Sequence, residues 1–341
     1  MNNNELYQIA NTLSKPPKGI LAADESTNTI TKRFNDIKVE SSFENRRKYR
    51  ELLFKTKDLN KFISGVILFD ETIRQSTDEG VLFGEFLKQL GIMPGIKVDA
   101  GAVPIELESL EKVTEGLDGL SERLDEYKKL GAVFTKWRAI IDINNKNTMP
   151  SDYCIDLNCY NLARYARIVQ DHGMVPIVEP EVLMDGSHDI NKCFEITSKT
   201  QKKLFEYLHT HNVSLNGILL KPNMIISAKK SLTQASISEV ASLTLKCLKE
   251  NVPNDVPGIV FLSGGQSNEL ATQHLNEMNK SSETFSWNLS FSYGRALQQP
   301  TLSLWKGEEK NIGDSQYALY KRSKLNSSAT LGEYSINLEN T

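Results

Sequence analysis

The sequence lacks the short motifs that identify most nucleotide-binding and metal-dependent proteins. Neither G-x-G-x-x-G nor G-x-x-x-x-G-K-[ST] occurs anywhere in its 341 residues. Histidine is scarce, and of the five only His209 and His211 lie close together, in a stretch expected to be helical. A metal site normally needs several His, Cys or acidic ligands at suitable spacing. We therefore expect no metal and no other cofactor.

Disulfide and membrane signals are missing as well. The four cysteines show neither C-x-x-C spacing nor a disulfide framework, which favours a reducing compartment. No apolar run approaches the length that crosses a bilayer, and the N-terminal segment does not read as a signal peptide. The net charge of −3 gives no electrostatic reason to bind nucleic acid or an anionic membrane, and scattered lysine pairs such as Lys229–Lys230 read as solvated helix faces. We expect a cytoplasmic protein without nucleic-acid or membrane partners.

What the sequence does contain is a series of eight short runs rich in Val, Ile, Leu and Phe. They cover residues 19–24, 62–70, 93–99, 133–141, 174–182, 216–224, 258–265 and 286–294. Near-continuous apolarity, rather than strict alternation, is typical of parallel strands covered on both faces. Helical patterns separate the runs, as in the spacing of Leu120, Leu124 and Tyr127.

Eight strands alternating with helices predict an α/β fold, the (β/α)8 TIM barrel. An open doubly wound sheet is the main alternative, but it would usually carry a glycine-rich phosphate loop after its first strand. No linker or low-complexity tract divides the chain, so we expect a single barrel domain over residues 1–341. A last helix is expected over residues 313–325, with a short polar tail from about residue 326.

Charged and small polar residues gather where the apolar runs end. They are Asp24, Lys97, Asp99, Lys136, Arg138, Glu179, Glu181, Lys221, the Ser263–Gly264–Gly265 turn, and Gly294 with Arg295. Residues two apart in a strand point the same way, so Lys136 with Arg138 can project into one space. Any one of these charges could be a solvent-facing strand end or a structural ion pair. So many at the carboxyl ends of strands, where barrel enzymes hold their active sites, predict a site.

Lys221 is the candidate nucleophile of this site. A lysine attacks a carbonyl only as the neutral amine, which burial among apolar residues and a neighbouring cation both favour. Lys221 follows Ile218, Leu219 and Leu220, and Lys136 could supply that cation. Such an amine forms an imine with a ketone, and the two glutamates could move the protons that the imine formation needs.

The Ser263–Gly264–Gly265 turn and Arg295 point to a phosphorylated substrate. A serine–glycine–glycine turn after a strand presents free backbone N–H groups, which bind anions. Arginine adds a bidentate phosphate partner. The turn alone is a weak signal, and it gains weight from the lysine at a neighbouring strand end.

At these residues the chain resembles the class I fructose-1,6-bisphosphate aldolases, up to about residue 334. The matching stretches are LAADEST (21–27), ENRRKYRELL (44–53), GVILFDET (65–72), GIKVDAG (95–101), LDGLSERLDEYKKLGAVFTKWR (117–138), PIVEPEVLMDG (176–186), LLKPNM (219–224), FLSGGQS (261–267) and FSYGRAL (291–297). Several blocks in the same order make the resemblance specific. It implies a TIM barrel, a homotetramer, and the reversible cleavage of fructose 1,6-bisphosphate in glycolysis and gluconeogenesis.

The resemblance also implies a role for each position. Lys221 would be the Schiff-base lysine, Glu179 the main proton shuttle with Glu181 beside it, and Asp24 the acceptor of the C4 hydroxyl proton. The remaining roles are tuning and orientation for Lys136 and Arg138, and substrate binding for Gly294. Ser263, Gly264 and Arg295 would hold the C1 phosphate. Ser26, Arg33 and Lys97 would lie toward the C6 phosphate, with Arg295 able to serve either end. Because the iminium is the electron sink, the family mechanism needs no metal.

Other functions remain open at this point. A barrel aldolase could act mainly on another ketose phosphate, such as fructose 1-phosphate or tagatose 1,6-bisphosphate. A scaffold that has lost catalysis is disfavoured, because it has no physical reason to keep four costly charges at Asp24, Lys136, Glu179 and Lys221.

The C-terminal tail departs from the family pattern. Relatives commonly end in a longer tail whose terminal tyrosine visits the active site, whereas this sequence ends at Thr341 and its last tyrosine is Tyr334. Two readings follow. The tail is a frayed end without contacts, or it enters the site and Tyr334 is a proton donor.

Overall fold

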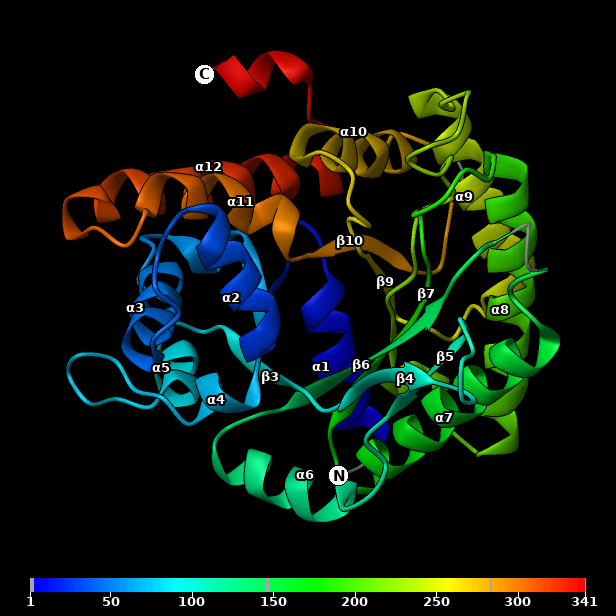
Figure 1. The fold of residues 1–341 in the computed structure, drawn as a ribbon, viewed down its shortest axis with the longest axis horizontal. Coiled ribbons are helices and arrows are strands. Elements are labelled where there is room, and N and C mark those ends of the chain that lie inside the picture. Colours follow the sequence, from blue (N-terminus) through cyan, green and yellow to red (C-terminus); the bar gives the residue numbers. More distant parts are fainter. Residues whose placement is uncertain (1–2, 145–147, 283, 341) are drawn as a thin grey trace.

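Eight parallel strands form a closed barrel in the computed structural model, which describes residues 3–144, 148–282 and 284–340 (Figure 1). The barrel strands are β1 (Gly19–Ala23), β2 (Ile63–Leu68), β3 (Met93–Lys97), β6 (Phe134–Ile141), β7 (Val175–Val182), β8 (Leu219–Leu220), β9 (Gly258–Phe261) and β10 (Asn288–Tyr293). Around the barrel they follow the order β1-β10-β9-β8-β7-β6-β3-β2, and β1 and β2 close it. Each of the eight predicted apolar runs contains one barrel strand, so the TIM-barrel prediction is confirmed.

Helices surround the barrel and connect its strands (Figure 1). The α-helices are α1 (Asn3–Ser14), α2 (Thr27–Asp36), α3 (Phe43–Phe54), α4 (Asp70–Ile73), α5 (Phe83–Gln89), α6 (Leu120–Lys129), α7 (Asp152–Asp171), α8 (Ile190–Thr210), α9 (Ile237–Asn251), α10 (Asn268–Asn279), α11 (Arg295–Trp305) and α12 (Ile312–Thr330). Short 3-10 turns are η1 (Leu59–Lys61), η3 (Leu215–Gly217), η4 (Glu309–Asn311) and η5 (Ile336–Asn340). None of the helices in the described ranges combines the length and apolarity needed to cross a membrane.

Serine residues fix where several of these helices begin. Ser42 and Ser151 accept hydrogen bonds from backbone N–H groups in the first turns of α3 and α7. At α9, the Ser236 side chain accepts from the N–H of Glu239, and the Glu239 carboxylate accepts from the N–H of Ser236. This capping box satisfies two backbone donors that a helix start leaves free, so the helix starts at a defined residue.

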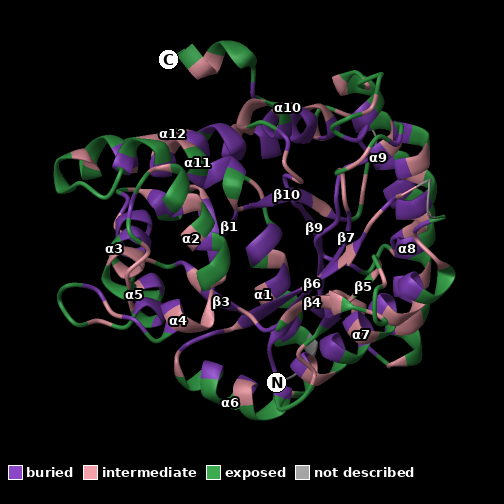
Figure 2. Ribbon diagram, in the orientation of Figure 1, coloured by how far each residue is buried: buried purple, intermediate pink, exposed green. Residues whose placement is uncertain are grey.

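The strands are buried on both faces, as Figure 2 shows, and the two faces serve different cores. On β1, Leu21 and Ala23 pack outward against the helices, while Ile20 and Ala22 point into the barrel. This arrangement explains why the runs read as almost continuously apolar rather than alternating.

The amino end of the barrel is filled by α1, which the sequence did not predict. Leu6, Ala10 and Leu13 of this helix pack into the inner core. Gly65 and Gly95 make the space: a Cβ on Gly65 would lie 2.6 Å from Leu13, and a Cβ on Gly95 would lie 2.3 Å from the Phe134 ring, both closer than packed atoms allow. The barrel is therefore closed at this end.

Two further elements also differ from the predictions. A two-stranded antiparallel sheet, β4 (Gly101–Pro104) with β5 (Lys112–Glu115), lies in the connection after β3. The last helix is longer than expected and extends to Thr330.

The segment after α12 is packed against the protein rather than frayed. Tyr334 is buried, and its N–H donates to Asn276 of α10 at 2.8 Å. Its hydroxyl donates to Glu339 at 2.8 Å, and Arg322 of α12 pairs with the same carboxylate. Figure 1 shows this segment beyond α10, outside the barrel. In this arrangement both readings of the tail are wrong, because Tyr334 has firm contacts and lies among α10 and α12.

The α1 plug gives a stability prediction. Leu13→Ala removes a fully buried side chain from the inner core, so we expect the free energy of unfolding to fall by about 2–5 kcal/mol. Leu232→Ala is the matched control at a fully exposed leucine and should change it by less than about 0.5 kcal/mol. Chemical denaturation of both variants measures the difference, and equal effects would contradict the role of the plug.

Candidate active site

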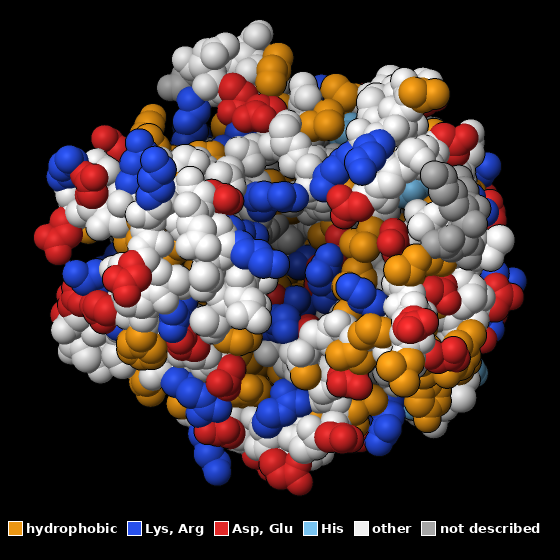
Figure 3. Space-filling model, viewed as in Figure 1, with side chains coloured by type: hydrophobic (Ala, Val, Ile, Leu, Met, Phe, Trp, Pro, Cys, Tyr) orange, Lys and Arg blue, Asp and Glu red, His pale blue; other side chains and the backbone are white. Residues whose placement is uncertain are grey.

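A cavity of about 340 Å³ opens at the carboxyl ends of the barrel strands. Figure 3 shows lysine and arginine side chains gathered around the hollow at the centre of this face. All the residues given a site role from the sequence line this cavity, whereas the strand-end residue Asp99 does not. The residues with such a role are Asp24, Ser26, Arg33, Lys97, Lys136, Arg138, Glu179, Glu181, Lys221, Ser263, Gly264, Gly294 and Arg295.

The inward positions of the strands explain how these charges come together. On β6, Phe134 lies in the inner core, and Lys136 and Arg138 follow on the same side, two and four residues along. On β7, Ile177 takes the inner position and Glu179 comes two residues later. The same side of a strand is thus apolar near the plug and charged near the cavity, because side chains repeat every second residue.

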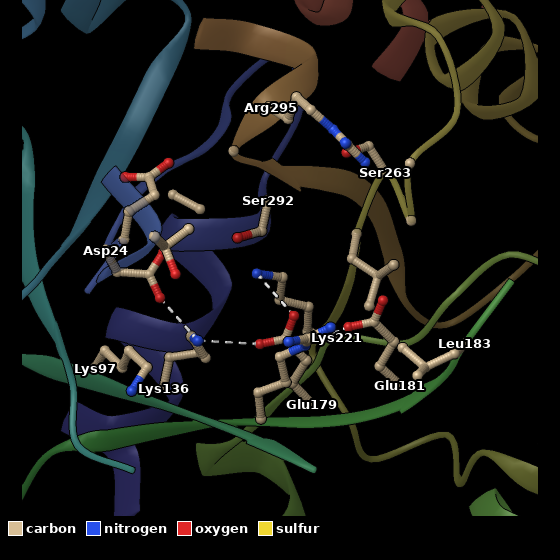
Figure 4. Close-up of a pocket in the computed structure, with 18 of the residues that line it drawn as sticks. Asp24, Lys97, Lys136, Glu179, Glu181, Leu183, Lys221, Ser263, Ser292 and Arg295 are labelled. Carbon is tan, nitrogen blue, oxygen red and sulfur yellow. Dashed lines mark hydrogen bonds and ion pairs between the residues drawn. The ribbon is translucent and has the colours of Figure 1, made fainter. Parts of the chain in front are cut away.

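Four charges of alternating sign, of which three are buried and Asp24 is partly exposed, form a chain across the bottom of the cavity (Figure 4). Asp24 Oδ2 lies 2.8 Å from Lys136 Nζ, Lys136 Nζ lies 3.4 Å from Glu179 Oε2, and Glu179 Oε1 lies 3.1 Å from Lys221 Nζ. Lys136, Glu179 and Lys221 are each less than 5% exposed. Glu179 Oε2 is buried and accepts no hydrogen bond from the described residues, so Lys136 is its partner only as an ion pair.

These neighbours determine the ionisation of Asp24 and Lys136. Burial alone would raise the pKa of Asp24, but the Lys136 ammonium, with Lys221 and Lys97, outweighs it and holds the pKa well below its usual value. Burial alone would lower the pKa of Lys136, but Asp24, Glu179 and Asp99 outweigh it and hold the pKa above its usual value. Asp24 is therefore a carboxylate that can accept a proton, and Lys136 is a permanent cation.

Lys221 directly follows β8 instead of lying within it. Its backbone N–H still donates to the Val178 carbonyl of β7 at 2.8 Å, so the ladder between the strands continues to this residue. The sequence predicts Lys136 as the cation beside Lys221. In the structure the Glu179 carboxylate lies between the two ammonium groups and contacts both. Glu179 is thus placed to exchange protons with the amine and with a molecule bound to it.

The turn after β9 forms one end of the cavity. Gly264 and Gly265 have φ values of +53° and +77°, which glycine adopts without strain. Two hydrogen bonds fix the turn. Gln266 Nε2 donates to the Ser263 carbonyl at 3.0 Å, and His274 Nδ1 of α10 donates to Gln266 Oε1 at 2.6 Å.

The expected C6-phosphate residues lie on the other side of Lys221, where each cation already has a carboxylate partner. Lys97 Nζ contacts Asp99 Oδ1 at 2.7 Å, and Arg33 pairs with Glu25. Figure 4 shows Lys97 beside Asp24 and Lys136, whereas Arg295 lies next to Ser263 on the opposite side. The cavity therefore offers cations at two separated ends.

Several lining residues escaped the sequence analysis, among them Glu25, Asp185, Lys229 and Ser292. Ser292 had a signal, because Ser290 and Ser292 are polar positions two apart in an otherwise apolar strand. Lys229 was read as part of a solvated helix face, and this is wrong: it lies in a loop between β8 and α9 and lines the cavity. The described residues hold no cluster of three His, Cys, Asp or Glu side chains that could bind a metal.

Comparisons with known proteins decide the family. A sequence model described as fructose-bisphosphate aldolase class-I matches residues 5–341. A probable fructose-bisphosphate aldolase class 1 of Xanthomonas axonopodis is 53% identical over 98% of this chain and 99% of its own length. The chain belongs to the class I fructose-bisphosphate aldolases.

More distant class I aldolases give the same result. The cytosolic fructose-bisphosphate aldolase 4 of Arabidopsis thaliana is 49% identical over 97% of this chain and 84% of its own. The solved aldolase of Plasmodium falciparum, crystallised with TRAP and an inhibitor, superposes with a TM-score of 0.95 at 47% identity, over 98% of this chain and 96% of that one. The resemblance found in the motifs is thus confirmed.

His274 gives a prediction about pH. Burial lowers the pKa of His274 from 6.5 to about 4. The unfolded chain therefore binds this proton below about pH 6.5, while the folded chain binds it only near pH 4, so stability falls as the pH drops between these values. His274→Asn keeps an N–H donor for Gln266 but cannot titrate. Its free energy of unfolding should decrease less between pH 7 and pH 5 than that of the wild type.

The exposed His209 provides the control. His209→Asn should leave the pH dependence of the unfolding free energy unchanged. If His274→Asn follows the wild-type curve as well, His274 does not contribute to the acid sensitivity.

Proposed function

We propose that this chain cleaves fructose 1,6-bisphosphate reversibly to dihydroxyacetone phosphate and glyceraldehyde 3-phosphate through a Schiff base on Lys221. The observation that carries the proposal is the Lys221 amine, buried at the base of a cation-rich cavity and in contact with the Glu179 carboxylate. Membership of the class I fructose-bisphosphate aldolases supports the substrate.

The first half of the reaction makes the imine. The neutral amine of Lys221 attacks the C2 carbonyl, and the resulting carbinolamine loses its hydroxyl as water. Glu179 first takes a proton from the Lys221 amine, which lies 3.1 Å from its Oε1, and then gives that proton to the leaving hydroxyl. The product is an iminium, which withdraws electrons from C3.

The second half breaks the bond between C3 and C4. Asp24 accepts the C4 hydroxyl proton, the bonding electrons pass into the iminium to form an enamine, and the aldehyde leaves. Protonation of the enamine at C3 and hydrolysis of the imine then release dihydroxyacetone phosphate and restore Lys221. Lys136 holds Asp24 as the carboxylate that this step requires.

The substrate phosphates occupy the two ends of the cavity in this proposal. Ser263, Gly264, Gly294 and Arg295 bind the C1 phosphate, and Ser26, Arg33 and Lys97 answer the C6 phosphate. Arg138 pairs with Glu181 and orients it beside the reacting carbons.

The molecule around this site is proposed to be a cytoplasmic homotetramer in which residues 1–341 form one barrel domain. Support comes from the family resemblance and from the cytosolic relative of Arabidopsis thaliana.

Trapping the imine tests the nucleophile. Borohydride added with dihydroxyacetone phosphate should inactivate the enzyme and leave the reduced adduct on the peptide that contains Lys221. Lys221→Ala should lose essentially all turnover, because the covalent route needs the amine. An adduct on Lys136 or Lys97 would disprove the assignment. Mass spectrometry of the digested protein reads out the site.

Two substrates test the C6 end of the cavity. Lys97→Ala should raise KM for fructose 1,6-bisphosphate about tenfold, the effect of one lost charge-assisted hydrogen bond. KM for fructose 1-phosphate, which has no C6 phosphate, should change by less than about twofold. The Lys97 charge also helps to lower the pKa of Asp24, but the loss of this effect would act on both substrates alike. Equal increases in both KM values would place Lys97 away from the C6 phosphate.

A further inference from the structure

Lys229 is held at the rim of the cavity by backbone hydrogen bonds. Its N–H donates to the Met184 carbonyl at 2.9 Å, and the next residue, Lys230, donates to the Gly186 carbonyl at 2.9 Å. These bonds join the loop after β8 to the loop after β7. The position of Lys229 relative to the cavity is therefore set by the backbone.

The Lys229 side chain reaches the turn after β9. Its Nζ lies 3.1 Å from the point that a Cβ of Gly265 would occupy, and Arg295 Nη2 lies 2.7 Å from the same point. Two cations thus lie on the same side of Gly265, where a side chain would be. Arg295 has no ion-pair partner within the described parts of the chain, whereas Lys229 Nζ contacts Asp185 Oδ1 at 2.8 Å.

Stability does not explain this arrangement. The side chains of Lys229 and Asp185 are 43% and 65% exposed, and ion pairs of that exposure stabilise a fold by only about 0–1 kcal/mol. Two like charges beside one glycine also repel each other. A phosphate monoester between them would relieve this repulsion, and its charge of nearly −2 calls for more than one cation.

We propose that Lys229 is a further substrate-binding residue, which binds the same phosphate as the Ser263–Gly265 turn and Arg295. Asp185 holds the Lys229 ammonium at the rim and gives it up when the phosphate binds. This inference rests on the proposed function, since it names another ligand of the C1 phosphate. Because Gly265 has no side chain, both cations have room beside the turn that binds this phosphate.

Three variants test the proposal, with inorganic phosphate as competitive inhibitor and fructose 1,6-bisphosphate as substrate. Lys229→Met should raise the inhibition constant of phosphate and KM about tenfold, with kcat within about threefold, because one charge-assisted contact is lost. Lys230→Met is the matched control at the neighbouring exposed lysine and should leave both constants unchanged. Asp185→Asn should lower the inhibition constant, since the competing carboxylate is removed.

The outcomes separate this inference from the proposed function. If borohydride traps dihydroxyacetone phosphate on Lys221 of the wild type while Lys229→Met binds phosphate as tightly as the wild type, only the role of Lys229 is overturned. If Lys229→Met and Lys230→Met weaken phosphate binding equally, the effect comes from the general positive charge of the surface, and the role of Lys229 is overturned as well. An unchanged inhibition constant in Asp185→Asn would overturn the part given to Asp185. If Lys229→Met fails to fold, Lys229→Gln and Asp185→Asn decide by the same criteria. Failure of trapping in the wild type would instead reject the Schiff base.

Discussion

A charge that is taken out of water needs an opposite charge beside it, and this constraint organises the whole centre of the molecule. Asp24, Lys136, Glu179 and Lys221 come from β6, β7 and the ends of β1 and β8, and each meets its counter-charge only when the barrel is closed. The catalytic groups of the proposed mechanism are thus assembled by the same contacts that make their burial tolerable. Moving any one strand by one residue would turn its charge out of the cavity.

The barrel and the composition of its site could be predicted because both depend on local patterns. Apolar runs at regular spacing gave the strands, and the charges at their ends gave Asp24, Lys136, Glu179 and Lys221 as one group. The order of the charges within the group could not be read in this way. Which carboxylate lies between the two lysines depends on the register of β6 with β7, where Arg138 is paired with Glu179.

Features that depend on packing between distant segments escaped the sequence. Nothing in Leu6, Ala10 and Leu13 distinguishes a helix that plugs a barrel from one that covers its outside. Lys229 lies eight positions beyond Lys221 in a segment without regular structure, and only the hydrogen bonds to the loop after β7 bring it to the cavity. Tyr334 likewise has its partner, Asn276, on a helix far back in the chain.

Because α1 fills the amino end of the barrel, the cavity opens only at the carboxyl ends of the strands. Whatever enters at the carboxyl ends of the strands must come out by the same route, since Leu13 and Phe134 fill the opposite end. In the proposed reaction the ketone half of the sugar stays bonded to Lys221 when the bond between C3 and C4 breaks, whereas the aldehyde half is released. Release and binding are therefore ordered. The aldehyde leaves first in cleavage, and in the reverse direction the ketone must already be bound to Lys221 before the aldehyde arrives.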